Sequence, residues 1–508
     1  MNNSALNELE LLERKLISVL SRCSLESVLL RIHKAEDEIP DFFFQMGMVS
    51  FAVRHCFLGN KTKNHNIIKE DWFNIIKKLS RRYFIADPLG EANNCDKNIA
   101  FSVQRIVGNQ NILNFRIYGV YSRTLKLFID IPKRLSERTD IKKFDIKSNF
   151  QKLNHSSIRE FIQLSFTAYA AASSQPYGAF LRNYFDLSEQ QGIELPPDKT
   201  RKRILGNITS YPKKFIDTFE SRKNKDRRFA LYDFNPLFMF PLIRPWPKKA
   251  KSNPAKEDRI IVPIPKLVLY RSTTGIYYQL FNHFGEAFSS YFGYIFESYI
   301  GEILEHSVKK GELISEDEFK NNNKTYKGKI PDWIIIQGDS VVLFECKATK
   351  LNRTALSTGS EKAINDSFTQ IRKAFKQLSE FTKYLNKEGK SSKLFAKCKK
   401  IKSFIVTLES FGVLSSSLND PYIEYIFNED KIELSDWRFI TMENLEILQP
   451  FLATGLRYED IFEEIHEKGF EEVQTELEQR TGKTHRDSFL DKPFEDMIEK
   501  MTQNARKD

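Results

Sequence analysis

Two carboxylates and a lysine stand at the ends of two short apolar runs in the second half of the chain. Asp332 directly precedes the run 333–336, and Glu345 and Lys347 end the run 341–347. If the two runs form adjacent antiparallel strands, both carboxylates come to the same end of the pair. Carboxylate oxygens beside a cationic side chain suit the binding of a divalent metal ion and of a phosphate group.

The two runs are predicted to form a hairpin. Residues 334–336 are all isoleucine, and residues 341–344 are valine, valine, leucine and phenylalanine, so both runs favour strands. Gly338 and Asp339 lie between them and favour a tight turn. Both faces of the second run are apolar, which is typical of a strand in the middle of a covered sheet.

Side-chain alternation along the second strand places Glu345 and Lys347 on one face and Cys346 on the other. Carboxylates buried in such a sheet need an opposite charge or a metal ion, because burying a lone charge is costly. Hard oxygen ligands that leave room for water are typical of Mg²⁺ or Mn²⁺ sites, not of zinc sites. Cys346 is predicted to be a small core residue rather than a nucleophile.

This arrangement resembles the PD-(D/E)xK nuclease superfamily, which has the restriction-endonuclease-like fold. The resemblance is carried by Pro331 and Asp332, twelve intervening residues, and the Glu-Cys-Lys triplet 345–347. It covers roughly residues 280–450. In that family a helix before the hairpin often supplies another acid, and Glu297 is at the matching position.

The resemblance implies metal-assisted hydrolysis of a phosphodiester. Asp332 and Glu345 would hold one or two Mg²⁺ or Mn²⁺ ions, with the Cys346 backbone carbonyl and Glu297 as further ligands. Lys347 would position the attacking water or stabilise the charge that develops on the phosphoryl group. For Lys347 to act as a base, its pKa would have to be lowered by desolvation.

Helical periodicity predicts one helix on each side of the hairpin. In the upstream helix, 286–306, Glu297 borders the apolar stripe, a position also typical of an ordinary solvated residue. The downstream helix, 361–386, carries Gln370 and Gln377 on neighbouring rows of one face. A glutamine of this helix often faces the site in the resembling family, which makes Gln370 a catalytic candidate. A polar flank of the helix is the plain alternative.

Two further strands, 401–408 and 437–441, would extend the sheet. The domain is therefore predicted to be α/β, with a central mixed sheet flanked by helices. A mainly α-helical region is predicted to precede it, because amphipathic patterns recur along the first half of the chain. Within that region, residues 111–131 fit either two strands or a buried helix.

The net charge of +11 favours a polyanionic partner, and its distribution is uneven. Residues 347–402 hold fifteen Lys and Arg against four Asp and Glu, and residues 198–259 hold seventeen against seven. A charge run usually marks a solvated face, but beside a nuclease-like motif phosphate contact is the preferred interpretation. The candidate phosphate contacts are cations of the downstream helix that lie off its apolar stripe: Lys362, Arg372, Lys373, Lys376 and Lys383.

Five cysteines lie far apart with no CxxC pair, which predicts a reducing compartment and no zinc site. The first residues lack a signal-peptide profile, and no apolar run approaches the length of a membrane span. We therefore expect a cytoplasmic protein without a membrane partner.

Three domains are predicted. Seven prolines between positions 236 and 265 mark a boundary, although an ordered extended segment within one domain fits them equally well. Residues 1–260 would form the helical region, with a role in sensing or targeting, and residues 261–450 the nuclease domain. Residues 451–508, with nine Lys and Arg against fifteen Asp and Glu, would form an acidic helical extension. That extension would either cap the nuclease domain or mimic nucleic acid over its basic surface.

The expected function is that of a Mg²⁺-dependent deoxyribonuclease, an endonuclease acting on duplex rather than single-stranded DNA. A homodimer or a partner protein is compatible with this role. By analogy, a large region fused to a nuclease suggests restriction or antiphage defence. Two alternatives stay open: a non-catalytic nucleic-acid-binding module that keeps the nuclease fold, and an RNA-directed nuclease effector, such as one that cuts transfer RNA.

Overall fold

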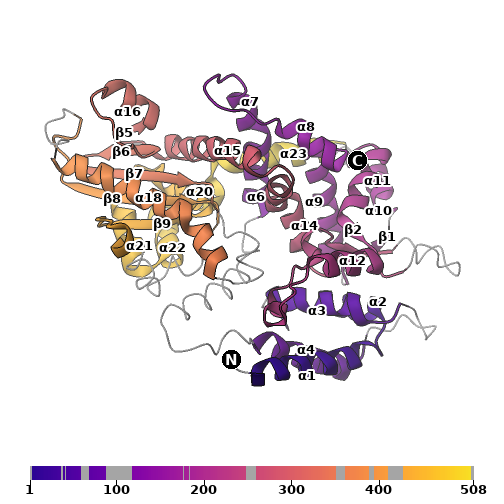
Figure 1. The fold of residues 1–508 in the computed structure, drawn as a ribbon. Helices are drawn as coiled ribbons and strands as arrows, with labels where there is room; N and C mark the ends of the chain where they lie inside the picture. Colours follow the sequence, from indigo (N-terminus) through magenta and orange to yellow (C-terminus); the bar gives the residue numbers. More distant parts are fainter. Residues whose placement is uncertain are drawn as a thin grey trace.

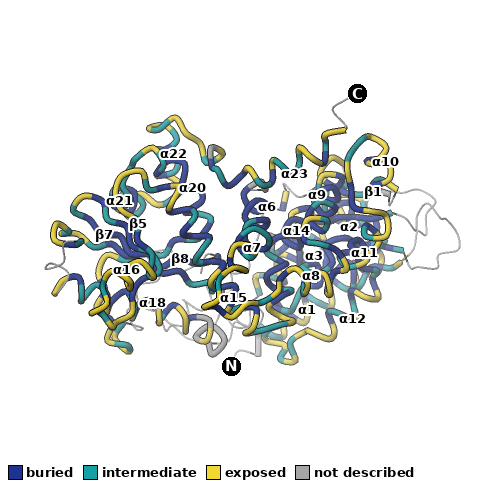
Figure 2. Tube along the Cα trace, turned by 90° about the horizontal axis from the view of Figure 1, so that it is seen from above, coloured by how far each residue is buried: buried dark blue, intermediate teal, exposed yellow. Residues whose placement is uncertain are grey.

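The structure is a computed structural model, and its class is mixed α/β. It describes the following residues: 3–35, 38–39, 42–58, 68–86, 117–175, 177–181, 183–246, 259–349, 361–387, 394–409 and 427–504. Figure 1 shows two groups of elements side by side, one mainly helical and one built around a larger sheet. Each group has its own buried interior (Figure 2).

The first half of the chain is mainly helical, as predicted. Its helices are α1 (Asn3–Leu20), α2 (Leu25–Lys34), α3 (Phe42–His55), α4 (Glu70–Ile85), α6 (Ile117–Leu125), α7 (Ile131–Leu135), α8 (Ile146–Asn154), α9 (Ile158–Ser174), α10 (Tyr184–Gln190), α11 (Asp198–Ile208), α12 (Pro212–Arg222) and α14 (Lys266–Ser272), with the 3-10 helices η4 (Arg227–Tyr232) and η5 (Pro236–Phe238). On α1, the leucines that form the predicted apolar stripe are buried: Leu9, Leu12, Leu16 and Leu20. Burial of one face against neighbouring helices is what stabilises helices of this length.

The strand interpretation of residues 111–131 is wrong for the described part of this segment. Residues 117–130 form α6 followed by the π-helix η3 (Lys126–Asp130), which leads into α7. Tyr121, Leu125 and Phe128 are all buried, because α6 and η3 are covered by other helices on several sides. A helix buried all round carries the same aromatic and branched residues as a strand, so composition alone does not separate the two.

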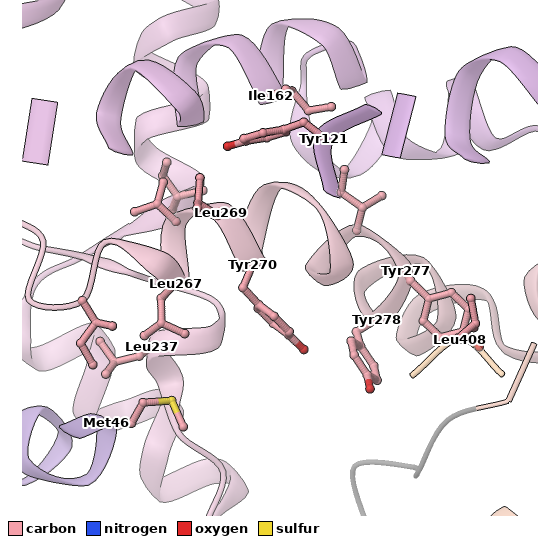
Figure 3. Packing of buried hydrophobic residues seen from close by; sticks show 14 of the residues in the cluster. Met46, Tyr121, Ile162, Leu237, Leu267, Leu269, Tyr270, Tyr277, Tyr278 and Leu408 are labelled. Carbon is pink, nitrogen blue, oxygen red and sulfur yellow. The ribbon is translucent and has the colours of Figure 1, made fainter. Parts of the chain in front are cut away.

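The proline-rich segment contributes two short strands to a small sheet. Its order is β1-β4-β3-β2, formed by β1 (Ala179–Leu181), β4 (Arg259–Ile261), β3 (Leu242–Ile243) and β2 (Thr209–Ser210). The segment therefore joins strands from the helical half of the chain. Around it, α14 and the start of α15 bury a cluster that includes Tyr270, Tyr277 and Tyr278 (Figure 3). Leu408, from the end of β8 (Lys400–Thr407), belongs to the same cluster.

The larger sheet has five strands in the order β5-β6-β7-β8-β9. They are β5 (Glu312–Ser315), β6 (Trp333–Gln337), β7 (Ser340–Lys347), β8 and β9 (Trp437–Thr441). The pairs β5–β6 and β6–β7 are antiparallel, whereas β7–β8 and β8–β9 are parallel. The predicted mixed sheet is therefore present, and β7 lies in its centre.

Helices cover both faces of this sheet. The long helix α15 (Thr274–Ser307), which contains a break at Gly285, contacts β7 on one face. Helix α18 (Glu361–Lys387) covers β7 and β8 on the other face (Figure 1). The two faces of β7 separate cleanly, since Val342 and Phe344 belong to one buried cluster and Val341 and Leu343 to another. This double coverage explains why the second run of the hairpin is apolar on both faces.

The acidic C-terminal segment packs on the molecule rather than standing apart. It follows α20 (Met442–Leu452) and consists of α21 (Tyr458–Lys468), α22 (Phe470–Thr481) and α23 (Lys492–Thr502). Tyr458 and Phe462 of α21 set their rings against Phe344 and Phe404 of the sheet, with centroids 5.3 and 4.8 Å apart. Helix α23 returns to the first half of the chain, where it contacts α6. These contacts agree with the capping interpretation, while the three domain boundaries stay predictions.

A buried ion pair joins the two groups of elements. Arg123 on α6 donates from two nitrogens to the two carboxylate oxygens of Glu446 on α20, each at 2.6 Å. Tyr299 on α15 donates its hydroxyl to the same carboxylate at 2.8 Å. Removing one member of such a pair leaves a buried charge and typically costs about 3–5 kcal/mol. The pair therefore fixes α6, α15 and α20 in one arrangement.

Candidate functional site

The predicted hairpin is present, and it brings Asp332 to the Glu-Cys-Lys triplet. Strand β6 pairs with β7 from Trp333 opposite Phe344 to the turn, where Gly338 has a φ of 66°. Strand β7 runs three residues beyond this pairing. There the Cys346 amide donates to Asp332 Oδ2 at 2.6 Å in place of a ladder hydrogen bond.

Glu345 lies at the centre of the site. Its side chain is fully buried on the face of β7 that α18 covers. Lys347, from the same face of the strand, forms an ion pair with one of its oxygens. The other oxygen accepts a hydrogen bond of 2.7 Å from Gln377 Nε2 on α18. Strand alternation thus puts Glu345 and Lys347 together, as predicted.

Cys346 faces the opposite side of β7, within the core next to α15. Burial raises the pKa of its thiol well above the ordinary value, so the thiol stays protonated and is no nucleophile. The amide and carbonyl of one strand residue point to the same edge of the strand. Because the Cys346 amide reaches Asp332, its carbonyl also points to the Asp332 edge, where the sequence predicts a metal ligand.

Burial and mutual repulsion govern the charges of this site. Burial raises the pKa of Asp332 to about 6, although Lys347 and the Cys346 amide act in the opposite direction. Burial and the neighbouring Asp332 raise the pKa of Glu345 well above its ordinary value. Two buried carboxylates that resist ionisation together are a setting in which a nearby cation is strongly favoured.

Lys347 is held in its charged form. Burial alone would lower its pKa, but Glu345 and Asp332 raise it above the ordinary value. A lysine that keeps its proton at neutral pH does not serve as a general base. Its ammonium group is instead suited to holding an anionic oxygen or orienting water beside the two carboxylates.

Glu297 lies near Asp332 but comes from the helix on the other face of the sheet. The indole of Trp333 donates to the backbone carbonyl of Glu297 at 3.2 Å, which ties α15 to the start of β6. One turn further on, Gly301 leaves the space that this indole fills, since an added Cβ would lie 2.1 Å from the ring. Burial, then the charges of Asp332 and Glu316, raise the pKa of Glu297 to about 8. Glu297 therefore belongs to the same group of interacting acids.

Glu316 is a member of this group that the sequence analysis did not single out. It begins α16 (Glu316–Asn322), directly after β5, and its amide donates to the backbone carbonyl of Asp332 at 3.0 Å. Its charge acts to raise the pKa of Asp332, Glu297 and Glu345. The available signal was the capping box formed by Ser315 and Glu318, which marks a helix start beside the strand that pairs with β6.

The glutamine that reaches the site is Gln377, not Gln370. Gln377 Nε2 donates both to Glu345 and to the backbone carbonyl of Ile330, each at 2.7 Å. Gln370 is exposed, two turns closer to the start of α18. Helical spacing placed the two glutamines on one face, but only the position of α18 on the sheet decides which of them meets Glu345.

The predicted metal ligands fit a hard divalent cation. Within the described residues no group of three or more His, Cys, Asp and Glu side chains is arranged to hold a metal ion. However, Mg²⁺ at phosphate-processing sites is usually bound by only one or two carboxylates, with waters and substrate oxygens completing its shell. Asp332 and Glu345 supply these two, and the Cys346 carbonyl lies on the same edge. Glu297 stands behind Asp332 as a further acid.

No protein-family model matches this chain, and no curated protein matches it in sequence. The geometry of the hairpin therefore has to carry the functional argument. Within the described ranges, none of the helices combines the length and the apolar character that crossing a bilayer requires.

Most of the predicted phosphate contacts on α18 are engaged with acids that follow β8 in the chain. Arg372 pairs with Glu429 at 2.7 Å, Lys376 with Asp430 at 3.0 Å, and Lys383 with Glu433 at 3.2 Å. Lys373 is exposed, and the side chain of Lys362 lies outside the described part of α18. A phosphate could contact the three paired cations only by displacing these acids.

The two glutamines of α18 allow a matched test of the site. We expect Gln377→Ala to lower the activity of the site by about 10- to 100-fold, the usual effect of removing a group that orients a metal ligand. Gln370→Ala removes an equal side chain from an exposed position of the same helix and should leave activity unchanged. Rates of DNA cleavage by the two variants measure the difference. Equal activity of both variants would mean that Gln377 does not orient Glu345 for the reaction.

Proposed function

We propose that this chain is a metal-dependent nuclease that hydrolyses phosphodiester bonds of DNA, and that its larger sheet has the restriction-endonuclease-like fold. The observation that carries the proposal is the convergence of Asp332, Glu345 and Lys347 where β7 outruns β6. The mixed sheet with α15 and α18 on its two faces supports the fold that the resemblance implies.

The residues of the site have distinct roles in this proposal. Asp332, Glu345 and the Cys346 carbonyl would hold Mg²⁺ or Mn²⁺, with Glu297 beside them. When bound, the metal ion supplies Lewis-acid stabilisation of the phosphate and an activated water. Lys347, held charged by Glu345, would stabilise a phosphate oxygen in the transition state.

Gln377 supports these roles from α18. It holds one oxygen of Glu345 and the backbone carbonyl of Ile330, two residues before Asp332. One amide group therefore links the segments that supply both carboxylates. Such a link reduces the freedom of the carboxylates before substrate arrives, which is how outer partners of a metal site contribute to catalysis.

The proposal is tested with a panel of substrates. Purified full-length protein is incubated with supercoiled plasmid, linear duplex DNA, single-stranded DNA and RNA in the presence of Mg²⁺ or Mn²⁺. We expect cleavage of DNA, including the closed plasmid, which marks an endonuclease. Cleavage of RNA alone would favour the RNA-directed alternative. Binding without cleavage of any substrate would favour the non-catalytic module, although Asp332, Glu345 and Lys347 are all in place.

A role in restriction or antiphage defence, in the cytoplasm and with a homodimer or partner protein, remains part of the proposal by analogy. The helical half of the chain would then carry a sensing or targeting function. Its contacts with the sheet-containing half support such a link, because the Arg123–Glu446 pair joins the two.

A further inference from the structure

A cavity lies within the helical half of the chain, among elements that are far from the hairpin in sequence. It encloses about 610 Å³ of empty space, part of it open to solvent. Helices α1, α3, α4 and α12 form its walls together with η4 and η5. Six aromatic rings line it: Phe43, Phe51, Tyr83, Phe84, Phe219 and Phe238. A concave, mostly aromatic site with a few polar groups is typical of small-molecule binding.

Arg54 of α3 stands among these rings. Its guanidinium lies 4.5 Å from the centroid of the Phe51 ring and 4.1 Å from that of Phe219. The Nε group donates to the Ser50 carbonyl, one turn earlier in the same helix, at 3.3 Å. The guanidinium is thus held by two aromatic rings and by one backbone oxygen. A guanidinium fixed in this way presents its terminal N–H groups in a constant direction.

The acids near Arg54 are engaged elsewhere. Glu13, which lines the cavity, forms an ion pair with Arg227. Asp233 accepts a hydrogen bond of 2.7 Å from the Asn224 amide, and burial raises its pKa, which favours its neutral form. Among the described residues, no carboxylate lies within ion-pair distance of Arg54.

An arginine that is half-buried without a carboxylate is unusual, because buried charges are normally paired. Burial lowers the pKa of Arg54, which agrees with a guanidinium that has lost much of its water. Stacking on Phe51 and Phe219 contributes attraction, but cation–π contacts do not replace an anion. The terminal N–H groups of Arg54 suit a planar pair of oxygens, as in a carboxylate, or the oxygens of a phosphate.

We propose that this cavity binds a small organic anion, with its carboxylate or phosphate on Arg54 and a flat apolar ring among the aromatic side chains. The site is independent of the proposed nuclease activity, since its residues lie outside the hairpin and its ligand needs no metal ion. It gives the helical half of the chain a ligand to sense.

The proposal is tested by calorimetric titration of the full-length protein, without metal ions, using four probes. Adenosine 5′-monophosphate and benzoate carry the two anions, and adenosine and benzamide are their neutral counterparts. We expect at least one anion to bind the wild type and its neutral counterpart to bind at least about tenfold more weakly, because a charge-assisted contact is lost. Which anion binds separates a phosphate ligand from a carboxylate ligand.

Three variants separate recognition from folding. Arg54→Gln should weaken binding of the anion by about 10- to 100-fold. Phe219→Leu keeps the charge but removes one ring, and should weaken binding by a smaller factor. Arg81→Gln removes the same charge from an exposed position on α4 and should leave binding unchanged. Thermal unfolding of each variant without ligand confirms that it is folded.

Binding of the neutral probes as tightly as the anions, or binding that is equal in the wild type and Arg54→Gln, would overturn the proposal. So would the absence of binding by both anions at millimolar concentration. Loss of DNA cleavage, by contrast, has no bearing on it.

Discussion

Replacing Lys347 by alanine is expected to abolish DNA cleavage while leaving DNA binding nearly unchanged. Lys347 is held charged beside Glu345 and Asp332, so its ammonium group can stabilise a transition-state oxygen. Loss of one such donor typically lowers a rate by about 100- to 1,000-fold. DNA affinity should change little, because one cation among many is removed. Cleavage rates and binding isotherms of the variant and the wild type give the two quantities.

Lys373→Ala is the matched control for this prediction. Lys373 is exposed on α18, so its loss removes the same charge from the same domain without touching the site. We expect wild-type cleavage from this variant. If Lys347→Ala cleaves as fast as Lys373→Ala, the motif lysine has no role in the chemistry.

Glu345→Gln is expected to abolish cleavage and to remove the stabilisation of the protein by Mg²⁺ or Mn²⁺. The amide keeps the size of the side chain but offers no negative charge to a cation. Several kcal/mol of transition-state stabilisation depend on a catalytic metal ion, so the rate should fall by at least about 1,000-fold. The change in unfolding temperature on adding metal reports binding separately from activity, because a ligand of the native state stabilises it.

The variant should still fold, because burial already disfavours the ionised form of Glu345 in the absence of a cation. Glu380→Gln is its control, since Glu380 is exposed on α18. A shift in unfolding temperature that is equal in the wild type, Glu345→Gln and Glu380→Gln would place the metal elsewhere on the protein.

The hairpin could be predicted from sequence because its signals are local. Three consecutive isoleucines, a Gly-Asp turn and a second apolar run define both strands, and their pairing then fixes where Asp332 meets Glu345. Alternation along β7 assigns Lys347 to the face of Glu345 and Cys346 to the opposite face. None of these steps requires knowledge of distant segments.

Features that depend on how distant elements dock could not be predicted in the same way. Gln370 and Gln377 are equivalent by helical spacing, and the docking of α18 on the sheet decides that Gln377 meets Glu345. The cations of α18 looked free for phosphate, but acids about 50 residues later in the chain pair with them, Arg372 with Glu429 among others. Short-range pattern carries no record of either contact.

The assignment of Glu297 shows where a family resemblance helps. Its position beside an apolar stripe fits a solvated residue as well as a functional one. The structure brings it near Asp332, with a pKa raised to about 8 by burial and by neighbouring acids. Glu316, which the resemblance did not indicate, joins the same group because β5 pairs with β6 and ends at α16.

The central claim is that Asp332, Glu345 and Lys347 form a metal-dependent phosphodiesterase site. Its most direct measurement is nicking of supercoiled plasmid by metal-free protein, by the same protein after addition of Mg²⁺, and by Lys347→Ala with Mg²⁺. The account predicts nicking only by the wild type with Mg²⁺, and loss of that activity on adding EDTA. Nicking that persists in EDTA, or that Lys347→Ala performs at the wild-type rate, would contradict it.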